Sequence, residues 1–258
     1  MKGSGLVLGL VVATLGSLPP TSVFAQQKPG NLTMIGELTP KAGARLQFEE
    51  GLKQLAAWHG SIKDAQSRAV FQQRTGENSG KYLVVLRGMH WADLDNPTPS
   101  DEQAEAEFAK AMGDTVASHI VRTYEEIPSL DHPRSPARNR PAKYYEIDTF
   151  HVPLGKQDRF AAAVARFREA IEKTKAPADL ICSVRSEGGQ FGTWLLAFGH
   201  DTAADFASPS PDEVLKNAFG SAAADSIVQE FSDLTGGFFT EEVIEFRPDL
   251  SYFPPESK

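Results

Sequence analysis

Apolar residues change their spacing along the chain, and each change predicts a switch between strand and helix. Leu52, Leu55 and Ala56 recur at the spacing of one helical face, whereas the run "GKYLVVLRG" (80–88) is typical of a strand. The elements expected in the first half are strand 31–38, helix 43–59, strands 68–75 and 81–90, a helix that begins near 100, and strand 119–127.

The second half of the chain predicts the same kinds of element in the same order. "KYYEIDTFHV" (143–152) is strand-like, and the turn-rich "SEGGQFG" (186–192) separates two further strand-like runs. The elements expected are strand 143–152, helix 156–174, strands 179–187 and 192–200, helices within 211–234, and strand 238–247.

The two halves also share sequence. "WADLDNPTPSDE" (91–102) is echoed by "AADFASPSPDEV" (203–214), an offset of 112 positions. The match continues upstream at that offset, and "PSLDHP" (128–133) matches "PDLSYF" (248–253) at an offset of 120. Matches at constant spacing over most of the chain indicate an internal duplication.

The order strand, helix, strand, strand, helix, strand is that of a ferredoxin-like unit, whose helices cover only one face of the sheet. We therefore predict an α+β fold with two tandem ferredoxin-like βαββαβ repeats, packed as an intrachain dimeric α/β barrel. The expected repeats are 26–128 and 143–258, joined by the Pro/Arg-rich linker 129–142. Further oligomerisation of this pseudo-dimer stays open.

The N-terminus has the pattern of a signal peptide over residues 1–25. Lys2 precedes the apolar run 6–18, and "SVFAQQ" places small residues before Gln26. The run is too short to span a bilayer of ~30 Å, and no later stretch is apolar for long enough. The alternative is an N-terminal membrane anchor. We expect an exported protein, periplasmic or extracellular.

Charge and cysteine content narrow the partners. The chain has 26 basic and 34 acidic residues, and its net charge of −8 argues against nucleic acid and anionic membranes as partners. Cys182 is the single cysteine, so an intrachain disulfide is excluded. Core packing is the ordinary role of such a residue, and its local sequence offers no activating group for a catalytic thiol.

A known group of proteins is similar around "KYYEIDTFHVPLGKQDRFAAAVARF" (143–167). This stretch resembles dimeric α/β-barrel proteins, above all NIPSNAP-type and antibiotic-biosynthesis-monooxygenase-type domains, although Pro153 and Leu154 stand in the reverse of the family order. The resemblance implies a small-ligand site and includes cofactor-free monooxygenases and haem-degrading enzymes, so the cofactor is left undetermined. The residues that carry it are Tyr144, Tyr145, Glu146, Ile147, Gly155, Lys156 and Phe160, and in the first half Gly36, Glu37, Leu38, Lys41 and Phe48.

Polar residues on the strands are the candidate ligand-binding groups. If their faces turn toward the space between the two sheets, Asp148 and Arg185 can form a buried pair beside a ligand, with Glu146 and Arg87 nearby. An Arg fork would suit a carboxylate or phenolate. The alternative is that these side chains face solvent or form a structural ion pair.

Histidines provide the candidate catalytic groups. His90 and His200 end the third strand of each half, close to Asp93 and Asp205, and are candidates for general acid or base catalysis. The alternative is a strand-end histidine bonded to a loop. By the family resemblance, His59 is a candidate haem ligand, or simply a histidine favoured by the helix C-terminus. No metal site is predicted, because ligand-spaced histidine pairs are lacking.

Two hypotheses for function remain. The first is a small-molecule site in the cavity between the repeats, with an oxygenase-like or haem-binding activity. The second is a non-catalytic binding or structural protein of the cell envelope, since the sequence lacks a phosphate loop, a nucleophile elbow and a zinc-protease motif.

Overall fold

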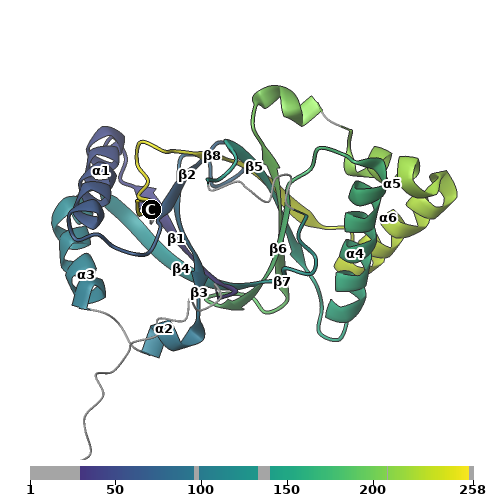
Figure 1. Ribbon diagram of the computed structural model, residues 1–258, viewed down its shortest axis with the longest axis horizontal. Helices are drawn as coiled ribbons and strands as arrows, with labels where there is room; N and C mark the ends of the chain where they lie inside the picture. The colour runs from purple at the N-terminus through teal and green to yellow at the C-terminus, as the bar shows by residue number, and fades with distance from the viewer. Residues whose placement is uncertain (1–29, 96–98, 133–139, 208, 256–258) are drawn as a thin grey trace, which may run out of the picture.

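A closed barrel of eight antiparallel strands forms the centre of the molecule, with helices on two opposite sides (Figure 1). The computed structural model describes residues 30–95, 99–132, 140–207 and 209–255. The predicted signal peptide, 1–25, and part of the predicted linker lie outside these ranges. None of the helices in the described ranges is long and apolar enough to cross a membrane.

The predicted strands and helices of both halves are confirmed to within about three residues at each end. The first half has β1 (Leu32–Pro40), α1 (Arg45–Ser61), β2 (Ala69–Gln73), β3 (Tyr82–Met89), α2 (Trp91–Asp95), α3 (Pro99–Met112) and β4 (Val116–Glu126). The second half has β5 (Tyr144–His151), α4 (Gln157–Thr174), β6 (Leu180–Glu187), β7 (Thr193–His200), the 3₁₀ helix η1 (Ala203–Ala207), α5 (Pro211–Phe219), α6 (Ser221–Thr235) and β8 (Phe239–Phe246).

The strands run around the barrel in the order β1-β3-β2-β8-β5-β7-β6-β4. Each half therefore contributes four adjacent strands, β4-β1-β3-β2 from the first and β8-β5-β7-β6 from the second. The two contributions join where β2 pairs with β8 and where β4 pairs with β6. Closure leaves each sheet without an unpaired strand, although parts of β4 and β8 extend beyond their partners.

Strand registers of the two halves correspond position by position. Leu38 pairs with Tyr82 and with His119. Phe150, 112 positions later, pairs with Trp194 and with Phe239 in the same way. The offsets between these partners, 112 and 120 positions, are those of the sequence matches.

Helices cover the outer face of the barrel, and the strand residues that touch them identify that face. Phe150 packs on Phe160 of α4 and on Phe231 of α6, with ring centroids 5.3 and 6.3 Å apart. Side chains at alternating positions of the same strands face the barrel interior, because strand side chains alternate between faces. The interior layer contains Ala69, Phe71, Ala142, Tyr145, Ile244 and Phe246.

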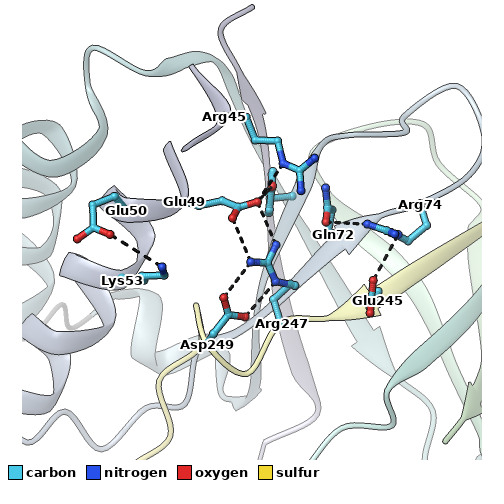
Figure 2. Close-up of polar contacts among 10 residues, drawn as sticks. Arg45, Glu49, Glu50, Lys53, Gln72, Arg74, Glu245, Arg247 and Asp249 are labelled. Atoms are coloured by element: carbon cyan, nitrogen blue, oxygen red, sulfur yellow. Dashed lines mark hydrogen bonds and ion pairs between the residues drawn. The ribbon is translucent and has the colours of Figure 1, made fainter. Parts of the chain in front are cut away.

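The segment after each last strand crosses to the other half. Leu250, which follows β8, is buried in the core beneath α1, whereas Leu130, which follows β4, is buried against α4. The guanidinium of Arg247 fixes the first of these tails through paired contacts of 3.0 and 3.1 Å with Glu49 on α1 (Figure 2). In Figure 1 the yellow segment that follows β8 accordingly lies beside α1.

Candidate functional site

An apolar cavity of about 240 Å³ lies between the first half's sheet and the helices α1 and α3. Its floor is the outer face of β1, β2, β3 and β4, and its roof is formed by the two helices. The C-terminal tail contributes Leu250 and Tyr252 to the wall. The lining residues are Met34, Gly36, Leu38, Leu52, Leu55, Ala56, His59, Arg68, Val70, Val84, Leu86, Ala104, Phe108, His119, Val121, Leu250 and Tyr252.

The corresponding place in the second half is packed with larger side chains. Three helices, α4, α5 and α6, cover that sheet, whereas α1 and α3 cover the first. Phe167 and Phe198 stand 112 positions after the cavity residues Leu55 and Leu86, and both pack in the second half's core. The added aromatic volume accounts for the difference, since protein interiors are close-packed.

His59 is a buried polar residue in the wall of the cavity. Its Nδ1 lies 2.8 Å from a carboxylate oxygen of Asp64, and Nη2 of Arg68 lies 3.1 Å from the same oxygen. Burial raises the pKa of Asp64, but the amide of Gln66 and the charge of Arg68 outweigh it, so the pKa is lowered. The carboxylate is thus ionised at neutral pH and favours a proton on Nδ1, which also lies 3.3 Å from Nε of Arg68.

The C-terminal tail holds this histidine from the other side. The ring of Tyr252 stacks on His59 with centroids 5.8 Å apart, and its hydroxyl donates a 2.6 Å hydrogen bond to the carbonyl of Asp64. Backbone hydrogen bonds between Arg68 and Tyr252, 2.9 and 3.0 Å long, fix the tail beside β2. The orientation of His59 thus depends on Tyr252, 193 positions later in the sequence.

His119 and Val121 lie at the mouth of the cavity, where β4 extends beyond its pairing with β6. Only Thr123–Glu126 of β4 pair with β6, and both mouth residues are exposed. The His119 ring packs on Phe108 at 5.2 Å and reaches over Gly36, where an added Cβ would lie 3.3 Å from Nε2. Partial burial of the ring lowers the pKa of His119, which favours the neutral imidazole.

Apolar walls with two imidazoles suit a compact, uncharged ligand that carries a hydrogen-bonding oxygen. With Nδ1 protonated, a neutral His59 ring has its lone pair on Nε2, the arrangement of a general base or a metal ligand. Haem does not fit this cavity, however. The cavity volume of about 240 Å³ is below the ~300 Å³ lower limit of pockets for drug-sized ligands, and haem is larger than such ligands.

The predicted ligand-binding residues are divided between the two faces of the barrel wall. Asp148 and Glu146 share the outer face with Phe150, whereas Arg185 and Arg87 point into the barrel. The predicted pair of Asp148 and Arg185 is therefore wrong. Helix packing determines which face of each strand lies outside the barrel. The alternation of polar residues in the sequence does not indicate that face.

Both arginines have partners inside the barrel. Arg87 binds Glu126 through two contacts of 2.6 Å, and Arg185 donates to the hydroxyl of Tyr124 at 2.7 and 3.2 Å. Neither residue lines the cavity described above. The predicted site between the two sheets and the cavity beneath α1 thus lie on opposite faces of the wall.

The predicted catalytic histidines also lie away from the cavity. Asp93 accepts a 2.7 Å hydrogen bond from the backbone amide of His90, and Asp205 accepts one of 2.9 Å from that of Asp201. The aspartates therefore bond to the backbone at the start of the short helices α2 and η1. The His200 ring packs on Phe206, with centroids 4.3 Å apart.

Three carboxylates converge on the outer face between β5 and β8. One carboxylate oxygen from each of Glu146, Asp148 and Glu241 lies within 4.8 Å of the other two. Burial, together with the charges of Glu146 and Glu241, raises the pKa of Asp148 to about 7.

Burial also raises the pKa of the Cys182 thiol to about 12, and the residue packs in the core as expected.

Comparison with solved structures identifies the architecture. The chain aligns with a proposed monooxygenase from Fusobacterium nucleatum over 83% of its own length and 91% of the other's, with a TM-score of 0.56 and 10% identity. The fold is that of the dimeric α/β-barrel proteins. An anthrone oxidase-like protein (TM-score 0.54, 13% identity, 84% and 91% covered) and a proposed monooxygenase from Lactobacillus acidophilus (0.52, 9%, 88% and 97%) share it.

Sequence comparison adds nothing to this dimeric α/β-barrel assignment. The sequence matches no protein-family model and no curated protein. At 9–13% identity the solved structures support the fold alone.

Sequence reasoning missed most of the cavity. The sequence suggests His59 as a haem ligand or as a histidine favoured by the helix C-terminus, and it does not single out Asp64, Arg68 or Tyr252. The spacing of "HGSIKDAQSR" (59–68) and the match of the 248–253 tail to 128–133 were the available signals.

Proposed function

We propose that this chain is a small-molecule-binding protein whose ligand occupies the cavity beneath α1 and α3. The observation that carries the proposal is an apolar cavity of about 240 Å³ whose wall includes His59, the partner of Asp64. Apolar cavities of ~150 Å³ bind benzene. A bicyclic aromatic molecule with one oxygen substituent is accordingly the ligand class that suits this volume.

The activity that we propose for the site is oxygenase-like. His59, oriented by Asp64, would remove a proton from an activated methylene beside a carbonyl group of the ligand. The resulting carbanion would be oxidised by dioxygen, so that CH₂ and O₂ give C=O and one water molecule. Names of the solved dimeric α/β-barrel structures, which include an anthrone oxidase-like protein, support this class of reaction.

Binding of 1-naphthol, measured by calorimetry, tests the ligand site. Ala56→Leu fills the cavity, whereas Ala57→Leu adds the same side chain at an exposed position of α1. We expect Ala56→Leu to weaken binding at least about tenfold and Ala57→Leu to leave it unchanged. Equal effects of the two variants would exclude the cavity as the site.

Oxygen uptake with 2-tetralone, an enolisable bicyclic ketone, tests the chemistry. His59→Gln is expected to reduce the rate by a factor of roughly 10² or more, the usual contribution of a general base. Binding of 1-naphthol without oxygen uptake would support the alternative of a non-catalytic binding protein. An absorption band of haem in the purified protein would contradict the size argument.

Two proposals concern the history and location of the chain. The corresponding registers of the two halves support an internal duplication, with repeats 26–128 and 143–258 forming an intrachain pseudo-dimer of the NIPSNAP or antibiotic-biosynthesis-monooxygenase type. The N-terminal pattern supports export to the periplasm or the extracellular space. The mass of the protein purified from its native cells tests export, because cleavage would leave Gln26 as the first residue.

A further inference from the structure

The second half exposes a group of large apolar side chains at one end. Leu154, Phe191, Phe238 and Phe239 are 82, 66, 83 and 52% exposed. Leu154, Phe191 and Phe238 come from three separate connections, β5 to α4, β6 to β7 and α6 to β8, and Phe239 is the first residue of β8. We call these four residues the apolar tip.

Hydrogen bonds and ring contacts hold the three connections side by side. The amide of Val152 donates to the carbonyl of Gly192 at 2.8 Å, which joins the first connection to the second. Lys156 Nζ donates to the carbonyl of Asp233 at 2.8 Å, which joins the first to α6 just before the third connection. The Phe239 ring stacks on Phe150 at 5.2 Å.

Two glycines direct one of these side chains outward. Gly236 and Gly237 have φ of +72° and +76°, values that L-residues rarely adopt, so the chain reverses tightly between α6 and β8. Phe238 follows directly and is the most exposed large apolar residue of the described chain. Its exposure therefore follows from a defined backbone turn.

Corresponding positions of the first half carry small residues. The residues at the positions of Leu154, Phe191 and Phe238 are Ala42, Ser79 and Ser118. Exposed large apolar groups lower solubility unless they contact something. The difference between two otherwise corresponding ends thus indicates that the second end has a partner.

We propose that the apolar tip inserts into the interface of a zwitterionic lipid membrane. The tip exposes roughly 500 Å² of apolar side chain, since a buried Phe covers ~150–250 Å². A stable protein dimer buries ~800 Å² on each partner, so the apolar area of the tip is too small to hold a second copy. Aromatic and leucine side chains on projecting loops suit the interface of a bilayer, which needs no complementary shape. The net charge of −8 favours neutral over anionic lipids.

Co-sedimentation with sucrose-loaded phosphatidylcholine vesicles tests this proposal. The variant L154A/F191S/F238S places the first half's residues on the tip and should reduce the bound fraction at least about tenfold. Leu46→Ser, at a 79% exposed position on α1, is the matched control and should bind like the wild type. F238S alone gives an intermediate reduction if the three residues act together.

Three outcomes would overturn the proposal. The first is that the wild-type protein does not sediment with the vesicles. The second is that the control loses binding as much as the triple variant does. The third is that ultracentrifugation shows a dimer of the wild-type protein and a monomer of the triple variant. The last outcome would assign the tip to a second copy of the chain. None of these results depends on ligand binding in the cavity beneath α1.

Discussion

Nδ1 of His59 lies 2.8 Å from a carboxylate oxygen of Asp64, and both side chains are nearly buried. A buried charge that loses its partner is costly, because Arg68 and His59 would then lack the carboxylate that they share. Asp64→Asn should therefore lower the free energy of unfolding by about 2 kcal/mol. Urea titration measures this loss. Asp114→Asn, an exposed change in the same half, should have no effect, and equal losses would argue against the pair.

Arg247 should stabilise the protein through Glu49 in a pH-dependent manner. The hydrogen bonds from Arg247 are the largest of the effects that lower the pKa of Glu49 from 4.5 to about 2. A lowered carboxyl pKa stabilises the native state above the unfolded value, and this contribution is lost as pH falls from about 4.5 toward 2.

Glu49→Gln tests this contact. It should cost about 2 kcal/mol at pH 7 and much less near pH 2, after allowance for screening of a partly exposed group. Urea titrations at both pH values give the comparison. A loss of equal size at both would show that the effect of the substitution is packing rather than charge.

Asp148 should have the opposite pH dependence. Its raised pKa of about 7 means that the native state binds this proton more tightly than the unfolded state does. The contribution is fully present below about pH 4 and is lost as pH rises through 7. Asp148→Asn should therefore stabilise the protein by about 2 kcal/mol at pH 8.5 and leave it unchanged at pH 4.

Thermal unfolding across that pH range measures the effect of Asp148. Asp158→Asn, an exposed acid at the start of α4, serves as the control and should not change the pH dependence. A destabilising effect of Asp148→Asn at pH 8.5 would show that the carboxylate has a stabilising partner.

The crossing tail should stabilise the core of the first half and shape its cavity. Leu250 is 2% exposed beneath α1, although it follows the last strand of the other half. Leu250→Ala should cost roughly 2–5 kcal/mol, the usual range for a buried leucine. It should also weaken 1-naphthol binding, because Leu250 lines the cavity. Leu46→Ala, an exposed leucine of α1, should change neither value.

Periodicity predicted the strands and helices because most side chains of this fold are either against a helix layer or in the barrel. Gly and Pro marked the turns, and the 112-residue offset paired the strands that adopt matching registers. The face of each strand was not predictable in this way. Asp148 and Arg185 have similar polar patterns, yet only Arg185 points into the barrel.

The cavity was beyond prediction for a different reason. It exists because Leu55 and Leu86 stand where the second half has Phe167 and Phe198, and because Tyr252 returns from the far end of the chain. The volume of such a cavity depends on the combined volumes of many side chains and on a long-range contact. Neither is expressed in local spacing.

A crystal of the protein grown with 1-naphthol tests the central claim most directly. Our account predicts one bicyclic ligand between α1, α3 and the first half's sheet, with its oxygen within hydrogen-bonding distance of His59 or His119 and the barrel interior unchanged. Ligand density inside the barrel beside Arg185 and Arg87, with the cavity beneath α1 still empty, would contradict it.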